Sequence, residues 1–318
     1  MSTQLATTFT AAVGERGSTS NTNHDEIHKI FGEPNEEYHA PSVEQLCTAK
    51  QLELVLELKK KCEAWIPTLG PDEQTFMTSE GLFLYYRYLT GYGWDKMKEA
   101  EDGLKKTCEW RAKIKPQNLT IEDLGEVGKS AFMYHYGYDK WNRPVVYIDM
   151  KKDKTPMTKE NIHLKYLSFV YFTEHLTKRM PKNVYQVTWI LDVTGADVSL
   201  SLVKQMKDTF LDLGVYYCER LSLAFVLNVT MSINLIWKFV SQFLAKQTVE
   251  RYHVFTKDNK KLRDALHHFF DEGRLLKEFH GTAEFDFSID VMKSFDSTIS
   301  IEDIKEAKKT TAVQEGTD

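Results

Sequence analysis

The chain has 318 residues, a formal net charge of −5 and a hydrophobic content of 42%. This length can bury a sizeable core and leaves room for one large domain and a smaller one. The acidic and basic residues are well mixed, which argues against a nucleic-acid partner, and no apolar run approaches the roughly 20 residues that span a bilayer.

The first residues show no basic start followed by an apolar core, so they do not predict a secretory signal. Residues 1–40 are rich in Ser, Thr, Asn and Gly without an apolar period, and they predict a disordered leader. The four cysteines form no CxxC pair, and we expect reduced thiols in a cytoplasmic protein. These cysteines are Cys47, Cys62, Cys108 and Cys218.

Residues 41–116 predict a small helical unit. Apolar residues recur at helical spacing from Val55 to Trp65, and this helix ends before the break at Gly70-Pro71. A second helix is expected over about 79–89, and a third over about 95–112 with Asp95 as its N-cap.

In residues 117–285 the pattern changes to alternating helices and strands. The order of the main elements is β-α-β-α-β, which predicts an α/β fold with a mostly parallel sheet and right-handed crossovers. The predicted strands are 144–150, 186–193, 221–229 and 251–255, and the predicted helices are 121–126, 160–180, 198–213, 231–244 and 260–270. Residues 286–318 are expected to be a C-terminal tail.

The predicted helix 231–244 has an unusually wide apolar side. Its apolar residues cover an arc of roughly 200°, whereas a surface helix needs a stripe of roughly 100°. Either the helix packs against a second protein element, or it borders something apolar that is not protein. The residues on this arc are Leu235, Ile236, Trp237, Phe239, Val240, Phe243 and Leu244.

The sequence gives little support for catalysis. It contains no GxGxxG or GxxxxGK[ST] phosphate loop, no HExxH and no GxSxG elbow. Asp192-Val193-Thr194-Gly195 follows a strand, but we interpret it as a structural turn, and we interpret Cys218 as a small buried hydrophobe. We therefore expect no enzymatic activity, no metal site and no cofactor.

Several motifs occur together in one order along the chain. They are Lys106-Thr107-Cys108-Glu109-Trp110-Arg111, then the segment from Gly137 to Tyr147 (GYDKWNRPVVY), then Tyr216-Tyr217-Cys218-Glu219-Arg220-Leu221, then Trp237-Lys238 with Phe243-Leu244, and last Thr248 before Arg251. In this order and spacing the chain resembles the CRAL-TRIO (Sec14-like) lipid-binding and lipid-transfer family over about residues 43–285.

The resemblance implies a helical CRAL-TRIO-N unit before an α/β lipid-binding domain whose sheet forms the pocket floor and whose helix 231–244 acts as a gate. Members of the family are non-catalytic and carry a lipid or another lipophile. The implied ligand is a bound phospholipid, with phosphatidylinositol as the first choice, exchanged by a cytoplasmic protein that associates transiently with membrane surfaces. The alternatives are a carrier of a neutral lipophile (retinoid, tocopherol or sterol-like) and a lipid-sensing regulatory scaffold. No protein partner is indicated.

The headgroup residues are assigned through the same resemblance. Phosphatidylinositol-binding members have a Glu in the YPER segment, matched by Glu219, and a Thr-x-x-Lys after the gate, matched by Thr248 and Arg251. Arg keeps the positive charge and adds bidentate reach to a phosphate. The alternative for Glu219 and Arg251 is a structural ion pair between neighbouring strand starts. The family's basic segment is changed here, with Thr90 and Tyr92 in place of two arginines.

The apolar part of the expected site comes from two strands and the gate. Residues at period two in the strands are candidates for the pocket floor or for ordinary core, and the sequence does not separate these two roles. The candidates are Trp189, Leu191, Leu223, Phe225 and Leu227 in the strands, and Ile236, Trp237, Val240, Phe243 and Leu244 in the gate.

Overall fold

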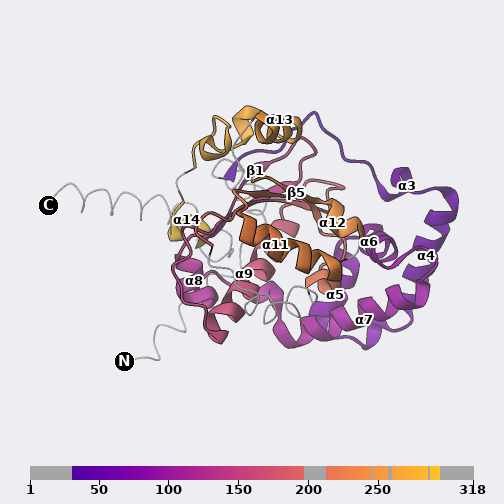
Figure 1. The fold of residues 1–318 in the computed structure, drawn as a ribbon. Coiled ribbons are helices and arrows are strands. Elements are labelled where there is room, and N and C mark those ends of the chain that lie inside the picture. The colour runs from indigo at the N-terminus through magenta and orange to yellow at the C-terminus, as the bar shows by residue number, and fades with distance from the viewer. Residues whose placement is uncertain (1–30, 197–212, 245, 257–259, 286, 294–318) are drawn as a thin grey trace, which may run out of the picture.

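The computed structural model describes residues 31–196, 213–244, 246–256, 260–285 and 287–293. They form a helical N-terminal region that lies against an α/β region built on one five-stranded sheet (Figure 1). The sequence predicts this fold class, and the structure confirms it.

The helical region contains the three predicted helices, shifted by a few residues. The expected break at Gly70-Pro71 is also the start of an additional helix, because a proline at the first helical position has no backbone N–H of its own that would need a partner. Lys96, and not Asp95, is the N-cap of the last helix. The helices are α3 (Val43–Leu46), α4 (Ala49–Glu63), α5 (Pro71–Ser79), α6 (Leu82–Tyr92) and α7 (Met97–Ile114), with a 3-10 turn at Ile66–Thr68.

The helical region has a core of its own. A capping box begins α4: the Thr48 hydroxyl accepts from the Gln51 backbone N–H (3.3 Å), and the Gln51 side chain accepts from the Thr48 backbone N–H (2.9 Å). Val55 and Leu58 lie on the inner side of α4 and are fully buried against residues of α6 and α7. The apolar spacing seen in the sequence therefore marks the core-facing side of this helix.

The α/β region contains a sheet with the strand order β1-β2-β3-β4-β5, in which only β1 runs antiparallel to its neighbour. The sequence analysis missed β1. The expected helix 198–213 falls almost entirely outside the described residues. The strands are β1 (Met133–Tyr138), β2 (Pro144–Asp149), β3 (Val187–Asp192), β4 (Leu221–Leu227) and β5 (Tyr252–Val254), and the helices are α8 (Gly125–Lys129), α9 (Lys159–Thr177), α11 (Met231–Val240), α12 (Lys246–Glu250), α13 (Lys260–Phe269) and α14 (Ile289–Lys293).

The two faces of the sheet are covered by different helices (Figure 1). On one face, Phe169 of α9 contacts Trp189 (ring centroids 5.3 Å apart), and Trp237 of α11 contacts Tyr252 (4.6 Å). On the other face, Phe225 packs against the end of α13. Both α9 and α11 therefore lie on one side of the sheet, and α13 lies on the other.

The helical region and the α/β region meet through buried polar contacts. Arg111 of α7 donates two hydrogen bonds to the carboxylate of Glu174 in α9 (2.7 and 2.9 Å), and the Tyr217 hydroxyl donates to the same carboxylate (2.8 Å). Trp110 stacks on Tyr216 with ring centroids 4.5 Å apart. Breaking one partner of such a buried pair costs about 3–5 kcal/mol, so these contacts fix the two regions relative to each other.

The expectation of a disordered leader does not hold for residues 31–40, which dock on the α/β region. Phe31 is 1% exposed and lies between the rings of His135 and Phe285. Asn35 and Asn142 exchange two hydrogen bonds, from the Asn35 backbone N–H to the Asn142 side chain (2.6 Å) and from the Asn142 amide to the Asn35 carbonyl (2.7 Å). A single buried aromatic residue gives no periodicity, and the sequence pattern therefore did not reveal it.

The start of the expected C-terminal tail is also part of the fold. Val291 and Met292 of α14 are buried, and the Tyr171 hydroxyl of α9 donates to the Met292 carbonyl oxygen (3.3 Å). The packed structure therefore continues beyond residue 285.

The buried position of Phe31 predicts the effect of removing its ring. Phe31→Ala is expected to lower the free energy of unfolding by about 3 kcal/mol, because it leaves a cavity between β1 and the C-terminal segment. Urea denaturation of the full chain measures this change. Leu56→Ala, which truncates a leucine that is 48% exposed on α4, is the matched control. Equal midpoints for the two variants would show that residues 31–40 are not part of the folded core.

Candidate functional site

The site expected from the sequence lies around α11. Asn228 follows β4 with a positive φ of 60°, and the Thr230 hydroxyl then caps α11 by accepting from the Ile233 backbone N–H (3.3 Å). The helix ends at Val240 and continues as a 3-10 turn over Ser241–Phe243. The predicted helix 231–244 is therefore one α-helix with a tighter last turn.

Although seven of its ten residues are apolar, α11 has no buried side chain in the part of the chain that the structure describes. Met231 is 83% exposed and Leu235 is 62% exposed. The remaining apolar gate candidates, Ile236, Trp237, Val240 and Leu244, are half-buried, and the side chain of Phe243 lies outside the description. The helix thus has incompletely covered apolar surface, as its wide apolar arc indicates.

The inner side of α11 touches the sheet at two places. Ile233 packs on an apolar cluster that includes Val193, Val226 and Val229, and the Trp237 ring lies on Tyr252. The helix is therefore held at its first turn and again near its last turn. This is the arrangement expected of an element that rests on a surface without being embedded in it.

The structure separates the strand candidates into two groups, because residues paired across neighbouring strands share a face. Trp189 pairs with Ala224 and Leu191 pairs with Val226, so both belong to the face that carries α11. Leu223, Phe225 and Leu227 lie on the opposite face and pack with the main core. All five therefore cannot line one cavity.

The residues that adjoin Trp189 and Leu191 on the α11 face were not singled out from the sequence. They are Ala224, Val226, Tyr252 and Val254. In β4 every residue except Ser222 is apolar, so the alternation that would distinguish its two faces is weak. Only the register with β3 reveals which half of β4 faces the helix.

Of the three headgroup candidates, Glu219 precedes β4, whereas Thr248 and Arg251 follow α11 and precede or adjoin β5. Arg251 forms an ion pair with the Glu219 carboxylate and donates a second hydrogen bond to the Leu221 carbonyl oxygen (2.8 Å). Thr248 lies one turn before Arg251, and its carbonyl oxygen accepts from the Arg251 backbone N–H (3.2 Å). Glu219 and Arg251 are thus in contact, which the structural ion-pair alternative requires and the headgroup assignment allows.

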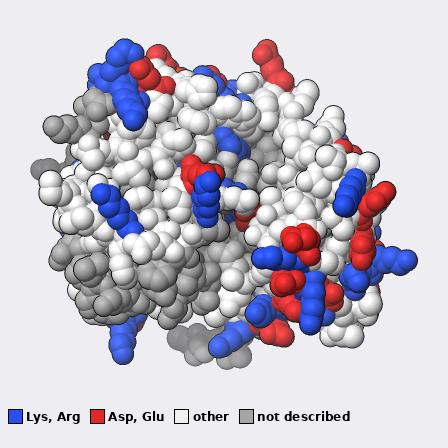
Figure 2. Space-filling model, turned by 45° about the vertical axis from the view of Figure 1, so that its right-hand side comes forward, with Lys and Arg blue, Asp and Glu red and all other residues white. Residues whose placement is uncertain are grey.

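Thr90 and Tyr92, which stand in place of two arginines of the family's basic segment, add no positive charge near Glu219 and Arg251. Tyr92 stacks on Tyr88, and its hydroxyl occupies the space above Gly103, where a Cβ would lie 2.6 Å from it. Tyr92 therefore fills the contact between α6 and α7. On the face drawn in Figure 2, Lys and Arg side chains are interleaved with Asp and Glu and form no continuous basic patch among the described residues.

Asp192 has the geometry of a structural turn. Its carboxylate accepts from the backbone N–H (2.9 Å) and hydroxyl (2.6 Å) of Thr194, from the Asn228 amide (3.0 Å) and from Lys151 (2.8 Å). Burial opposes ionisation, but these hydrogen bonds prevail and lower the pKa of Asp192 to about 2. Asp192 therefore remains a charged acceptor that ties together the carboxyl ends of β3 and β4.

The other chemical candidates are also accounted for by packing. Burial raises the pKa of the Cys218 thiol to about 12, which suppresses the nucleophilic thiolate at neutral pH. The described residues contain no group of three or more His, Cys, Asp or Glu side chains placed to hold a metal ion.

Glu80 and Arg220, to which the sequence assigned no role, form an ion pair beside the turn that carries Glu219. These two residues are 140 positions apart, and no local spacing connects them. None of the described helices is long and apolar enough to cross a membrane.

Comparisons with known proteins agree with this architecture. Residues 128–281 match the family model described as the CRAL/TRIO domain. A CRAL-TRIO domain-containing protein of Schizosaccharomyces pombe is 23% identical over 257 residues, which are 78% of this chain but only 24% of that protein. The chain therefore spans about a quarter of the length of this relative.

The fold is similar to a solved structure as well. The crystal structure of Sfh5 matches with a TM-score of 0.60 and 15% sequence identity, covering 84% of this chain and 98% of the other. Residues 128–281 thus match the CRAL/TRIO domain, and the resemblance of this chain to the CRAL-TRIO family is confirmed.

Proposed function

We propose that this chain binds a lipid between α11 and the sheet and exchanges it at membrane surfaces, without catalysis. The observation that carries the proposal is α11 itself, which is mostly apolar and yet lacks a buried side chain in the described structure. An uncovered apolar helix above an apolar sheet face suits a ligand or a membrane made of hydrocarbon. A cytoplasmic protein with transient membrane association fits this role.

The energetics of such a carrier favour a lid of this kind. Burying an acyl chain contributes about 0.8 kcal/mol per CH₂, so two long chains represent roughly 20 kcal/mol relative to water. The bilayer offers the same gain, and transfer between the two is therefore close to neutral. The protein needs only a path that keeps the chains away from water, and α11, with contacts at Ile233 and Trp237, is the element placed to provide it.

For the headgroup we propose a phosphatidylinositol site at Glu219, Thr248 and Arg251. An arginine offers five N–H donors, and the contacts of Arg251 with Glu219 and Leu221 use two of them among the described residues. The guanidinium thus retains donors suited to a phosphate diester, and Glu219 is an acceptor suited to inositol hydroxyls.

One observation favours a neutral lipophile as the second candidate. The charge of Arg251 is already balanced by Glu219, so the pair can act as a purely structural lock at the start of β4 and β5. In that case the proposed site between α11 and the sheet would hold a ligand without a phosphate, and the arginine would not affect the choice of ligand.

Purified protein is expected to carry a co-purifying phospholipid, visible by native mass spectrometry as a mass increase that solvent extraction removes. It is also expected to transfer that lipid between liposomes. The combination of ligand-free protein and absent transfer would contradict the proposal, and extraction of a neutral lipophile would support the second candidate.

The exposed apolar residues at the start of α11 predict the membrane contact. Met231→Ser combined with Leu235→Ser is expected to weaken binding to vesicles about tenfold or more, because it removes two apolar side chains from the bilayer surface. Co-sedimentation with phosphatidylcholine vesicles measures this. Leu56→Ser, on the distant surface of α4, is the control and should bind as the wild type does. Equal binding by all three proteins would place the membrane contact elsewhere.

Removal of the Arg251 charge tests the headgroup site. Arg251→Gln is expected to reduce phosphatidylinositol transfer about tenfold, by the loss of a charge-assisted hydrogen bond to phosphate, and to leave the transfer of neutral lipophiles unchanged. Lys246→Gln removes the same charge from an exposed position in α12 and should have no effect. Retained phosphatidylinositol transfer in a folded Arg251→Gln protein would favour the structural lock.

A further inference from the structure

The turn that carries Glu219 has an unfavourable backbone conformation. Glu219 has a φ of 58°, in the left-handed region that residues with a side chain seldom adopt. Such a conformation persists only where the surrounding structure holds it. The contacts around residues 218–220 therefore decide where the Glu219 carboxylate points.

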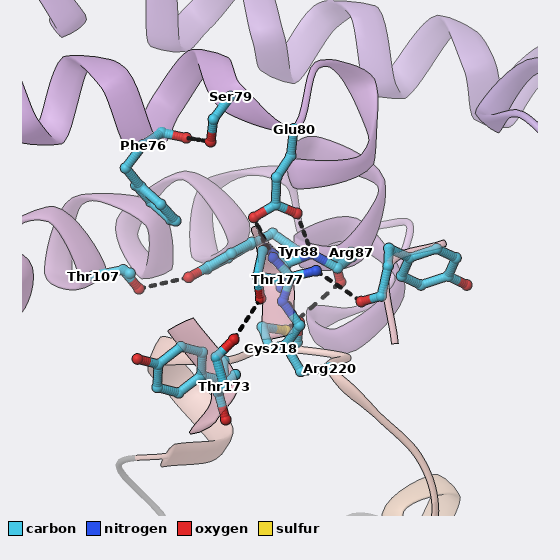
Figure 3. Close-up of polar contacts among 12 residues, drawn as sticks. Phe76, Ser79, Glu80, Arg87, Tyr88, Thr107, Thr173, Thr177, Cys218 and Arg220 are labelled. Carbon is cyan, nitrogen blue, oxygen red and sulfur yellow. Dashed lines mark hydrogen bonds and ion pairs between the residues drawn. The ribbon is translucent and has the colours of Figure 1, made fainter. Parts of the chain in front are cut away.

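Those contacts come from α6 and from Glu80, the C-cap residue of α5, and they centre on the Glu80 carboxylate (Figure 3). The Glu80 carboxylate accepts two hydrogen bonds from Arg87, at 3.1 Å from Nη2 and 3.2 Å from Nε. It also accepts from Nη2 of Arg220, the residue that follows Glu219. One carboxylate of the helical region therefore joins an arginine of its own region to an arginine of the α/β region.

The same two arginines bind the backbone of the turn and of its neighbour. Arg87 donates from Nη1 to the Cys218 carbonyl oxygen, and Arg220 donates to the Tyr185 carbonyl oxygen (2.7 Å). Gln186 in turn donates to the Glu219 carbonyl oxygen (3.2 Å). The Cys218 carbonyl oxygen before Glu219 is thus held by Arg87, which Glu80 binds, and the Glu219 carbonyl oxygen is held by Gln186.

Helix α6 also presses directly on the turn at Gly91. A Cβ at Gly91 would lie 2.3 Å from the Cys218 sulfur and 3.3 Å from Cγ of Glu219. The Cys218 thiol donates to the Arg87 carbonyl oxygen (3.6 Å). The close approach leaves no space for the turn to move toward the helix.

The charges in this cluster are retained at neutral pH. Burial opposes ionisation of Glu80, but Arg220 and Arg87 hold its pKa below the ordinary range. Burial, together with the neighbouring Arg87, lowers the pKa of Arg220 to about 10. Arg220 is therefore still protonated at pH 7, and Glu80 is an ionised acceptor for both guanidinium groups.

We propose that Glu80 is a positioning residue for headgroup selection, because it fixes the turn at residues 218–220 and so holds Glu219 against Arg251. This inference rests on the proposed function and assigns part of the selectivity to the helical region, which contributes no side chain to the proposed headgroup site itself. Loss of this clamp frees Glu219 and lets Arg251 shift, whereas the apolar part of the site, on the sheet and α11, keeps its shape.

The first experiment compares the transfer of two lipids by the full chain, phosphatidylinositol and phosphatidylcholine, each from defined liposomes. Glu80→Gln is expected to reduce the ratio of phosphatidylinositol to phosphatidylcholine transfer about tenfold, the effect of one lost charge-assisted hydrogen bond. Transfer of phosphatidylcholine should remain within about twofold of the wild type. Arg111→Lys, which weakens the other buried ion pair of the same interface, should lower stability without changing the ratio.

A second pair of variants tests the clamp without removing a charge. Gly91→Ala improves the intrinsic helix propensity of α6, but its Cβ would displace Cys218 and the turn, so the ratio should fall. Adding Cys218→Ala removes the sulfur atom that the new Cβ would meet, and the double variant should recover the wild-type ratio. This rescue is not expected if Gly91→Ala acts only by destabilising the protein.

The outcomes separate the two proposals. A wild-type protein that transfers neither lipid, or transfers both equally, overturns the proposed phosphatidylinositol carrier. If the wild type prefers phosphatidylinositol and Glu80→Gln keeps that preference, or loses both lipids in equal measure, the positioning role is wrong and the carrier stands. If Glu80→Gln does not fold, the Gly91→Ala pair decides, and an unchanged ratio in Gly91→Ala overturns the positioning role.

Discussion

Two carboxylates between the helical region and the α/β region, Glu174 buried and Glu80 largely buried, determine how this chain is assembled. The Glu174 carboxylate accepts hydrogen bonds from Arg111 and Tyr217, and the Glu80 carboxylate accepts hydrogen bonds from Arg87 and Arg220. Moving such charges out of water is costly, and a well-packed apolar contact would be at least as stable. What the ion pairs add is direction, because a carboxylate binds a guanidinium in few orientations. The interface therefore fixes the orientation of α6 on the sheet, and with it the turn at Glu219.

The contacts of α11 are of the opposite kind, apolar and not directional. They are few, and Met231 and Leu235 project from the surface. Apolar contacts impose little orientation, and among the described residues no hydrogen bond between side chains joins α11 to the sheet. A helix with contacts at Ile233 and Trp237 can therefore separate from the sheet without breaking such a bond within the described part of the chain. A carrier needs both properties, namely a defined polar end that selects the ligand and a compliant apolar side that admits it.

The sequence predicted those parts of the fold that depend on local periodicity. The helices around Val55 and Leu104 and the buried strands at Val146 and Ile190 followed from spacing alone. Phe31 and β1 could not be predicted in this way, because one aromatic residue has no period and β1 is a short strand ending at the turn before Arg143. For the site, the resemblance to the family pointed to Glu219 and Arg251. The division of β4 into two faces, however, depends on its register with β3, and the contacts of Glu80 are recognised only when α6 is placed in space.

The segment that contains α11 is attached to the rest of the molecule by polar contacts near both of its ends. The segment from Glu219 to Arg251 leaves the sheet through β4, crosses it as α11 and returns through β5, and the ion pair between its ends closes this loop of 32 positions at the base. At the far edge, Asn228 is bound to Asp192 just before α11 begins. Movement of α11 is therefore anchored at both ends by polar contacts, one to β3 and one to the turn that Glu80 holds. If α11 is the proposed lid, its fixed ends allow it to swing away from the sheet only about its flanking turns, and the proposed headgroup end stays in place.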